Sequence, residues 1–256
     1  NYYRYYRIFA LSGIVEFHEG PVDWIVPKTN EIGPSLAFHI RLSKSRWQEE
    51  LDELMEGIRS KSVPARWLIT PDADPNNIVE VLKGKGFKSL SEDAENPEPG
   101  MMLYKSDFSP YSHLEKSNIL CKEIRTKEEF TVWVEVVNTA LHGWEMIDAE
   151  HYSSWIEQDN IRLFLAEIDG VPVSTAATIQ TGSTASLEFV SALKEHRRQK
   201  AAITLCSRAI EALFDRGVET VTLSGSSEAV SLYERLGFHW WKNVMRNRLT
   251  RRAGSI

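Results

Sequence analysis

The sequence predicts a mixed α/β (α+β) fold in two similar domains, and three observations support this prediction. Strand-like and helix-like segments alternate in the second half, hairpin and crossover connections both occur there, and short motifs recur at one fixed spacing. The chain has 256 residues, of which 42% are hydrophobic and 26% charged, so it can bury a substantial core. We expect each domain to be a mixed, mostly antiparallel sheet flanked by helices.

The first half contains fewer clear signals. It opens on the aromatic and basic segment NYYRYYRIFALSG, which we interpret as an amphipathic helix ending at Gly13. The later segments ARWLITP and NNIVEVLKGKG are typical of a strand and a helix. Residues 91–100 are acidic, contain proline and are nearly free of apolar side chains, so we expect a loop, and 105–118 is a second polar stretch. We therefore place the domains at 1–108 and 119–256.

The second half gives a clearer order of elements. Thr126 and Glu129 form the capping-box pattern of a helix start, and Asp169-Gly170 is typical of a two-residue hairpin turn. The expected order is strand ILCKEIR, a helix after Thr126, helix AEHYSSWIEQ, strands IRLFLAEI, VPVSTAATI and ASLEFVSAL, helix KAAITLCSRAIEALFDRG, strand VETVTLSG, helix SEAVSLYERLG and strand FHWWKNVMRNRL.

Several short matches share one spacing along the chain. SLAF at 35–38 resembles SLEF at 186–189, and the Gly-Phe pair at 86–87 resembles the pair at 237–238. The same spacing relates further residues: Arg46 to Arg197, Gln48 to Gln199, Leu54 to Leu205 and Val79 to Val230. Matches in one register across a strand, a helix and a helix end indicate a tandem duplication with a shorter first copy.

Composition and charge argue against several classes of function. The net charge is −6, and the only basic run, 246–252, we interpret as a solvated strand edge, so we expect no nucleic-acid partner. Cys121 and Cys206 lie outside any C-x-x-C motif, which favours a reducing compartment. No apolar run approaches the ~20 residues of a membrane span, and the N-terminal segment lacks a signal-peptide cleavage site. We expect a cytoplasmic monomer or homodimer with no membrane partner.

One turn in the second half is suited to binding an anion. The segment KEHRRQKAA follows a strand and runs directly into a long helix. A helix N-terminus leaves about four backbone N–H groups without partners and carries the positive end of the helix dipole. Arg197, Arg198 and Lys200 add positive charge, so a phosphate or pyrophosphate could bind here. The alternative is that these basic side chains are simply solvated.

The string of elements from Leu187 to Phe238 resembles the hallmark region of the GNAT N-acetyltransferase superfamily. That region consists of a strand, an R-x-x-G-x-G/A turn, a helix, a strand and the motif N-x-x-A-x-x-x-Y-x-x-x-G-F. Here the turn is RRQKAA from Arg197 to Ala202, and the later motif is SSEAVSLYERLGF, beginning at Ser226. The resemblance covers about residues 120–250. With the shorter first copy included, the chain is similar to tandem-GNAT proteins.

The resemblance implies that acetyl-CoA is the co-substrate and that the acceptor is a primary amine of a small molecule or peptide. Backbone groups of Val190 and Ala192 would bind the pantetheine arm, which lies as a pseudo-strand between two splayed strands. Backbone N–H groups of the turn would hold the pyrophosphate: Arg197, Arg198, Gln199, Lys200, Ala201 and Ala202. Transfer of a larger acyl group stays open. We see no metal site, because His142 and His151 have no ligand partners at suitable spacing.

Two side chains would handle protons in such a transfer. Tyr233 would protonate the departing thiolate as general acid, and Glu188 would act as general base, directly or through water. The alternatives are that Tyr233 only packs and that Glu188 is an ordinary strand residue facing water. By the same resemblance, a loop with three candidate residues lines the acceptor site, unless it is simply exposed: His142, Trp144 and Glu145.

The sequence also departs from the family pattern. Lys200 replaces the first motif glycine, and Lys194 replaces the usual proline before the arginine. Ser226 replaces the asparagine, and we expect it to cap the following helix. In the first copy, Leu82 matches Tyr233, Ala37 matches Glu188 and Glu49 matches Lys200, with Glu50 beside it, so we expect that copy to be degenerate. A non-catalytic CoA-sensing or protein-binding module is therefore the alternative function.

Overall fold

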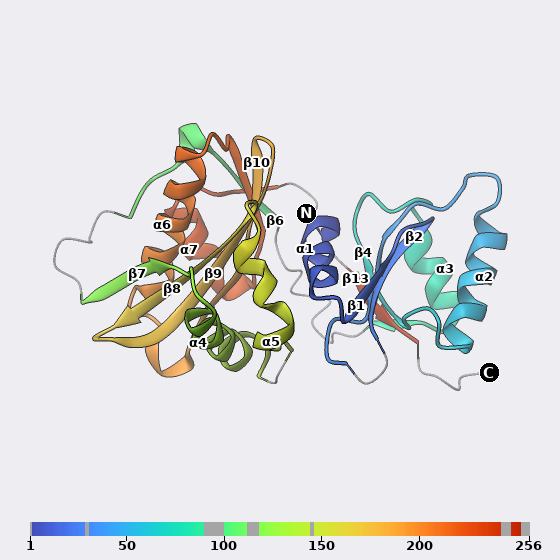
Figure 1. Cartoon of the computed structure of the whole chain (residues 1–256). Helices are drawn as coiled ribbons and strands as arrows, with labels where there is room; N and C mark the ends of the chain where they lie inside the picture. The colour runs from blue at the N-terminus through green and yellow to red at the C-terminus, as the bar shows by residue number, and fades with distance from the viewer. Residues whose placement is uncertain are drawn as a thin grey trace. The chain divides into compact units, whose positions relative to one another are not determined.

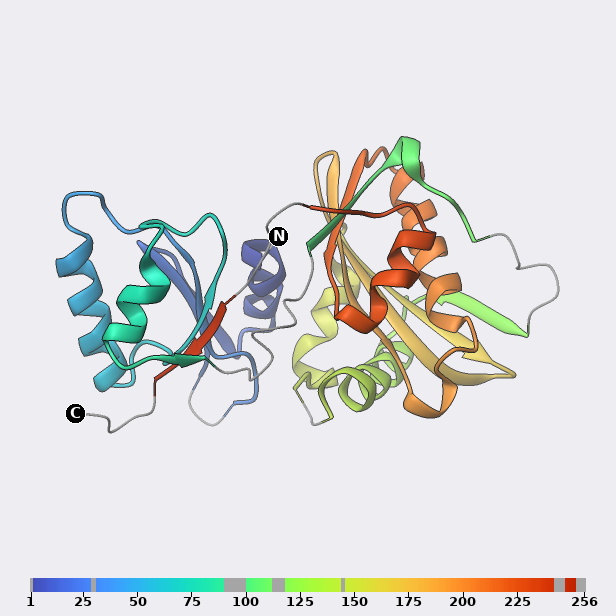
Figure 2. The same cartoon turned by 180° about the vertical axis from the view of Figure 1, so that it is seen from behind.

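The computed structural model describes residues 2–28, 31–89, 100–111, 118–143, 146–241 and 247–251, and it divides the chain into two compact units (Figures 1 and 2). The N-terminal unit comprises Tyr2–Glu98 together with Lys242–Ile256, and the C-terminal unit comprises Pro99–Trp241. In the part of the chain that the structure describes, no helix combines the length and apolarity needed to cross a membrane.

The N-terminal unit is a six-stranded sheet with helices on both faces. The strand order is β1-β2-β3-β4-β13-β5, and only β3 and β4 are parallel. Its elements are α1 (Tyr2–Phe9), β1 (Val15–His18), β2 (Val22–Pro27), β3 (Leu36–Ile40), α2 (Trp47–Arg59), β4 (Arg66–Ile69), α3 (Ile78–Gly84), β5 (Lys88–Ser89) and β13 (Asn247–Thr250).

The core of the N-terminal unit lies between the sheet and the helices α2 and α3, with α1 on the opposite face (Figure 1). The helix predicted at the N-terminus is confirmed. It continues as a 3-10 turn over Ala10–Ser12 and ends at Gly13, whose φ of 75° is a left-handed conformation that glycine adopts without strain.

The C-terminal unit is a seven-stranded sheet in the order β12-β6-β11-β10-β9-β8-β7, in which only β10 and β11 are parallel. Its main elements are β6 (Gly100–Tyr104), β7 (Ile119–Glu123), α4 (Lys127–Val137), α5 (Ala149–Tyr152), β8 (Ile161–Ile168), β9 (Val171–Thr181), β10 (Thr184–Ala192), α6 (Ala201–Asp215), β11 (Thr220–Ser224), α7 (Val230–Arg235) and β12 (His239–Trp240).

The helices of the C-terminal unit cover both faces of its sheet, α4 and α5 on one and α6 and α7 on the other (Figures 1 and 2). Local signals were accurate here. Thr126 and Glu129 form the predicted capping box at the start of α4. Asp169 and Gly170 have φ values of 51° and 80° in the turn between β8 and β9, as a two-residue hairpin requires.

The end of the chain departs from the prediction of one final strand in the second domain. His239–Trp240 forms the edge strand of the C-terminal sheet, whereas Asn247–Thr250 is an inner strand of the N-terminal sheet, between β4 and β5. The basic run at 246–252 is therefore not a strand edge over its described part. β6 occupies the matching inner place between β11 and β12, so it belongs to the C-terminal unit, although the expected boundary put it in the first domain.

The two sheets repeat features that support the tandem duplication. β5 and β12 are 151 positions apart, and both lie next to the inner strand that the other half of the sequence supplies. β3 and β10 each contain a bulge with one non-glycine residue at positive φ: His39 at 54° and Phe189 at 50°. This shared irregularity is a stronger sign of common origin than the short sequence matches, because a bulge is a specific backbone feature.

Candidate functional site

An open strand edge is the central feature of the C-terminal unit. β10 and β11 pair only from Thr184 opposite Thr220 to Ser186 opposite Thr222, although β10 continues to Ala192. The bulge after Glu188 shifts the register of β10 against β9 at this point. Beyond Ser186, β10 pairs with no described strand on its β11 side, and we refer to this unpaired stretch between the two strands as the gap.

Backbone groups of β10 point into this gap. The Leu193 N–H donates to the carbonyl oxygen of Val173 at 2.9 Å, on the β9 side. Backbone groups of successive residues in an extended strand point to opposite edges, so the N–H and C=O of Ala192 face the gap, as do those of Val190. The Arg197 side chain reaches the Ala192 carbonyl, with an Nε-to-oxygen distance of 3.4 Å. Val190 and Ala192 stay predicted backbone contacts of the pantetheine arm.

The turn that follows β10 has the backbone of a glycine-rich loop but contains no glycine. A 3-10 turn over Lys194–His196 leads into it, Arg198 has φ of 63° and Lys200 has φ of 72°. α6 then starts at Ala201 with no side-chain cap and no acidic residue in its first turn. The side chains from Arg197 to Lys200 are exposed. Free N–H groups, the helix dipole and this positive charge together suit an anion.

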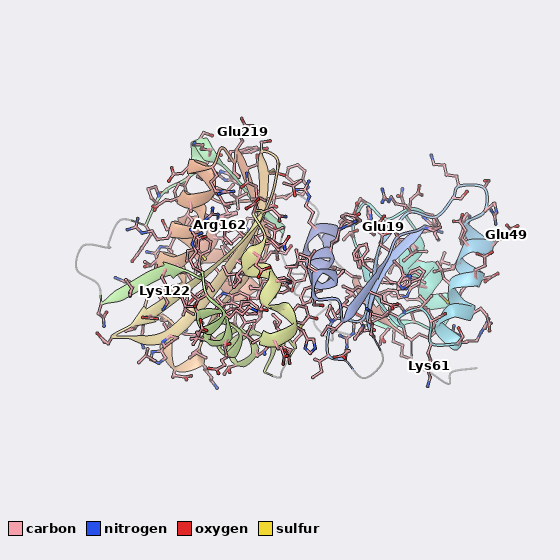
Figure 3. All side chains as sticks on the ribbon, viewed as in Figure 1. Glu19, Glu49, Lys61, Lys122, Arg162 and Glu219 are labelled. Atoms are coloured by element: carbon pink, nitrogen blue, oxygen red, sulfur yellow. The ribbon has the colours of Figure 1, made fainter. Side chains whose placement is uncertain are left out.

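The corresponding turn of the N-terminal unit is closed to anions by its own residues. α2 begins at Trp47, so the residues that match the turn before α6 belong instead to the first turn of the helix α2. The Ser43 N–H donates to Oε2 of Glu50 at 2.8 Å, and Arg46 pairs with Glu49 at 2.9 Å. Figure 3 labels Glu49 on α2. Carboxylates at this position neutralise the helix N-terminus and repel a phosphate.

The gap beside β3 in the N-terminal unit is also filled. β3 and β4 pair only through Ala37 and Trp67. Beyond this point Asp74 takes the place of a strand: its N–H donates to Ile40 O and its carbonyl accepts from the Leu42 N–H, both at 3.0 Å. Asp74 therefore pairs with the β4 side of β3, the side that corresponds to the gap beside β10, which gives a physical basis for a degenerate first copy.

Glu188 lies on β10 immediately before the bulge, with a partly buried side chain. Burial raises the pKa of Glu188 to about 7, and the nearby Ser186 hydroxyl opposes this rise. A carboxyl group with a pKa near neutral can accept and return a proton at physiological pH.

Tyr233 lies on α7 and is only 3% exposed. Its ring packs on Phe238, at 5.7 Å between centroids, and on Gly225, where an added Cβ would lie 2.7 Å from Cε2 of the ring. Burial raises the pKa of Tyr233, and the charges of Cys206 and Glu188 raise it further, so the phenol stays protonated.

Ser226 departs from its predicted role as a helix cap. It precedes the 3-10 turn Ser227–Ala229 with an exposed side chain that makes no capping hydrogen bond. Its backbone carbonyl accepts from the Ala229 N–H at 3.0 Å instead. The extended backbone of Ser226 (ψ 156°) is compatible with a cap, so the difference lies in the side chain alone.

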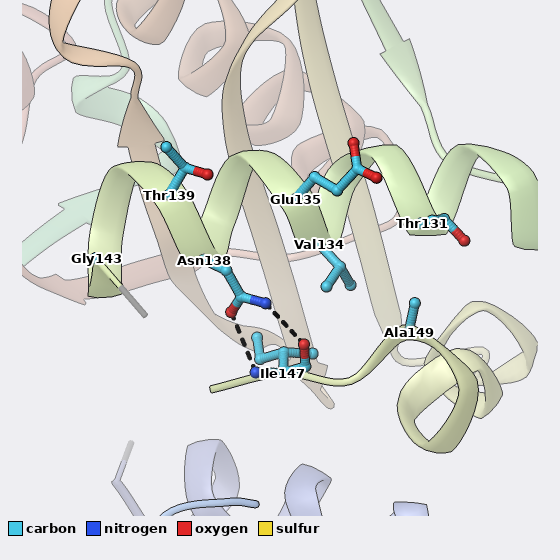
Figure 4. Close-up of a pocket in the computed structure, with 8 residues that line it drawn as sticks. All are labelled: Thr131, Val134, Glu135, Asn138, Thr139, Gly143, Ile147 and Ala149. Carbon is cyan, nitrogen blue, oxygen red and sulfur yellow. Dashed lines mark hydrogen bonds between the residues drawn. The ribbon is translucent and has the colours of Figure 1, made fainter. Parts of the chain in front are cut away.

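A hollow of about 530 Å³ lies along α4 and the π-helix Asn138–His142 that continues it (Figure 4). Asn138 fixes the loop opposite: its amide donates to Ile147 O at 2.8 Å, and its side-chain oxygen accepts from the Ile147 N–H at 3.1 Å. The lining residues are Thr131, Val134, Glu135, Asn138, Thr139, Gly143, Ile147 and Ala149. Sequence reasoning missed them, although polar residues at 131, 135 and 138 recur at helical spacing.

The predicted acceptor residues are only partly placed. The backbone of His142 belongs to the π-helix, but its side chain and the residues Trp144 and Glu145 lie outside the described part of the chain. Their neighbours Gly143 and Ile147 line the hollow. Among the described residues, no group of three or more His, Cys, Asp or Glu side chains is arranged to hold a metal ion.

Strong ion pairs elsewhere in the C-terminal unit are structural. Lys122 binds Glu167 at 2.8 Å, and Arg162 binds Glu123 at 2.5 Å, each pair joining β7 to β8. Figure 3 labels Lys122 and Arg162. These cations lie on strands remote in the sheet order from β10 and β11 and already have carboxylate partners. The exposed basic side chains of the turn before α6 are better suited to an external anion.

Comparisons with known proteins agree with this geometry. Residues 123–238 match the model of the acetyltransferase (GNAT) family. A GCN5-related N-acetyltransferase from Kribbella flavida has a similar structure, with a TM-score of 0.71, 18% identity and coverage of 99% of this chain and 95% of that one. No curated protein matches the sequence.

Two further solved structures resemble the chain over most of its length. A GCN5-related N-acetyltransferase from Sphaerobacter thermophilus has a TM-score of 0.64 and 17% identity, covering 91% of this chain and 80% of that one. A tandem GNAT protein from the clavulanic acid biosynthesis pathway has a TM-score of 0.63 and 13% identity, covering 99% and 95%. At these identities the likeness shows the fold.

Proposed function

We propose, from the match of residues 123–238 to the model of the acetyltransferase (GNAT) family, that the C-terminal unit is an acetyl-CoA-dependent N-acetyltransferase. Its acceptor is a primary amine of a small molecule or, alternatively, of a peptide. The observation that carries this proposal is the open gap beside β10, which leads directly to the uncapped N-terminus of α6. The N-terminal unit takes no cofactor, because its own chain fills the equivalent positions.

The donor is held mainly by backbone groups. The pantetheine arm lies in the gap and bonds to the backbone of Val190 and Ala192, in place of the missing strand. The pyrophosphate sits at the turn, where N–H groups from Arg197 to Ala202 and the positive end of the α6 dipole stabilise its charge. Lys200 contributes a cation at the position where the family has glycine.

The reaction is a direct transfer with two proton movements. The neutral amine nitrogen attacks the thioester carbonyl carbon, so a C–N bond forms and the C–S bond breaks. Glu188 takes the proton that the amine loses, directly or through one water, and Tyr233 gives a proton to the departing thiolate. Desolvation supports the role of Glu188 by raising its pKa to about 7. Desolvation also keeps Tyr233 protonated, and it makes the phenol a weaker acid.

The acceptor side is proposed to be the hollow along α4 and the loop beside it. Glu135 is the one charged residue among the described lining residues, and it favours a cationic or polar amine over an acidic one. We keep His142, Trp144 and Glu145 as proposed substrate contacts, because Gly143 and Ile147 of the same loop line the hollow.

Replacement of Tyr233 by phenylalanine tests the chemistry. The ring keeps its packing on Phe238 and Gly225, so acetyl-CoA affinity should stay within about twofold, while kcat falls about 10²- to 10⁴-fold with the loss of the acid. The measurement is release of the CoA thiol with a panel of small amines. Tyr104→Phe, at a 47% exposed position, is the matched control. Equal kcat in both variants would reduce Tyr233 to a packing residue.

The rival function is a CoA-sensing or protein-binding module. One observation favours it: Lys200 takes a left-handed φ of 72° at a position where a side chain can crowd the pyrophosphate. Such a module binds acetyl-CoA or a protein partner but releases no thiol with any amine. Binding without turnover across the panel would therefore favour the rival.

A further inference from the structure

The bulge in β10 holds a strained residue that its surroundings fix in place. Phe189 has φ of 50°, which is unfavourable for a residue with a bulky side chain. Its ring is 4% exposed and packs against Trp133 and Trp155, with centroid distances of 5.5 and 5.7 Å. These contacts hold the side chain, but they do not determine the direction of the peptide groups on either side of it.

Two adjacent residues on β9 donate hydrogen bonds from their hydroxyls to carbonyl groups of the bulge. Thr175 donates from Oγ1 to the Phe189 carbonyl at 2.9 Å, and its Oγ1 is also 2.7 Å from Oγ of Ser191. Ser174 donates to the Ser191 carbonyl at 2.5 Å. Ser174 and Thr175 are fully buried and Ser191 is 7% exposed, so water does not compete for these bonds.

The planarity of the peptide bond carries this constraint across the strand. In a trans peptide the carbonyl of one residue and the N–H of the next point in opposite directions. Holding the Phe189 carbonyl toward β9 therefore turns the Val190 N–H toward the gap. Holding the Ser191 carbonyl does the same for the Ala192 N–H. The two hydroxyls thus orient both amides that we assign to the pantetheine arm.

We propose that Ser174 and Thr175 are positioning residues for the acyl donor, acting through the peptide groups of the β10 bulge. This inference rests on the proposed function for its cofactor. The hydrogen bonds from the Ser174 and Thr175 hydroxyls to the bulge carbonyls, however, are present in the free protein. Glu188 directly precedes the bulge, so the same two hydrogen bonds also help to fix the position of the Glu188 backbone, from which its side chain extends.

The N-terminal unit holds its bulge differently, which supports this assignment. There Asp23, on the strand next to the bulge, bonds the side chain of His39 at 2.6 Å between Oδ2 and Nδ1, and it accepts the Gly20 N–H at 3.0 Å. No hydroxyl–carbonyl bond to the bulge occurs among the described residues of that unit. Hydrogen bonds from hydroxyls to the bulge carbonyls are thus found in the C-terminal unit, whose gap is open.

Amide hydrogen exchange in the free protein is the first arm of the test. The double variant S174A/T175V removes both hydroxyls, whereas the single variant T175S keeps both. T178V is the control, because Thr178 is equally buried on β9 but pairs with Leu187 before the bulge. We expect the Leu193 amide, which donates to Val173, to exchange about three- to tenfold faster in S174A/T175V than in T178V or T175S. Equal exchange rates in all variants would show that the two hydroxyls do not hold the peptide groups of the bulge in place.

Calorimetric titration with acetyl-CoA is the second arm. We expect S174A/T175V to bind about tenfold more weakly than wild type, with T175S and T178V within about twofold. Unchanged affinity in S174A/T175V, with wild type binding normally, would overturn the positioning role and leave the proposed function intact. Wild type that does not bind would instead overturn the proposed function, and the positioning role with it.

Discussion

Replacing Leu249 by aspartate is expected to unfold the N-terminal unit, although Leu249 lies near the end of the sequence. Leu249 is 1% exposed on β13 and belongs to the core formed with Leu51, Trp67 and Leu82. β13 is an inner strand, so its loss also leaves β4 and β5 without a common partner. An unpaired carboxylate in this core should cost more than about 4 kcal/mol, which is a large share of the stability of a domain.

The measurement is peptide-resolved hydrogen exchange combined with chemical unfolding. In Leu249→Asp, peptides from β1 to α3 should lose protection, while those from β8 to α6 keep it. Leu249→Met is the matched control and should cost less than about 1.5 kcal/mol. Leu103→Asp, in the inner strand β6, should produce the opposite pattern. Loss of protection in the C-terminal unit on Leu249→Asp would show that β13 does not belong to the N-terminal sheet.

Replacing Glu188 by glutamine is expected to abolish the base and its pH dependence. With the pKa of Glu188 at about 7, wild-type kcat/KM should fall as the pH drops below 7, because the carboxylate becomes protonated. Glu188→Gln should lower kcat/KM about 10²- to 10⁴-fold above pH 7. The ratio of wild-type to variant rates cancels the titration of the amine itself, so this ratio is the quantity to plot against pH.

The same variant makes a prediction about stability that needs no substrate. The pKa of Glu188 is raised in the folded state, from 4.5 to about 7, so the folded protein binds this proton more tightly than the unfolded chain does. The destabilisation is absent below pH 4.5, grows between 4.5 and 7, and is complete above 7. Glu188→Gln should therefore be about 1–3 kcal/mol more stable than wild type at pH 8 and no different at pH 4.

Glu195→Gln is the control for both Glu188 measurements, because Glu195 is exposed on the 3-10 turn after β10. It should leave the rate and the stability unchanged at every pH. A Glu188→Gln enzyme with wild-type kcat/KM, or a rate ratio that does not depend on pH, would remove Glu188 from the proposed mechanism.

Much of the fold could be predicted because its signals are local. A capping box, a two-residue turn and a helix end depend on a few neighbouring residues, and Thr126, Asp169-Gly170 and Gly13 adopt the predicted conformations. The sheets that β6 and β13 join, each with the other half of the sequence, could not be predicted in this way. Long-range pairing decides which sheet a short strand such as β6 joins, and the sequence of β6 indicates only that the strand is apolar.

In the candidate site, too, local features could be predicted and long-range contacts could not. The turn from Arg197 to Ala202 and the gap beside β10 follow from the motif, since residue order and helix start are local properties. The roles of Ser174 and Thr175 were not predictable, because hydroxyl residues in a strand give no sign that they face a bulge carbonyl. The filling of the first gap by Asp74 likewise depends on how a loop folds back on β3.

Calorimetric titration of wild type and Lys200→Gly with acetyl-CoA asks directly whether the C-terminal unit binds the cofactor. We expect one site per chain with micromolar affinity, because only the C-terminal unit leaves its gap and helix N-terminus open. Lys200→Gly should bind about three- to tenfold more tightly and be about 1 kcal/mol more stable, since glycine adopts φ of 72° without strain. Two sites per chain, or no binding at millimolar acetyl-CoA in either protein, would contradict the account.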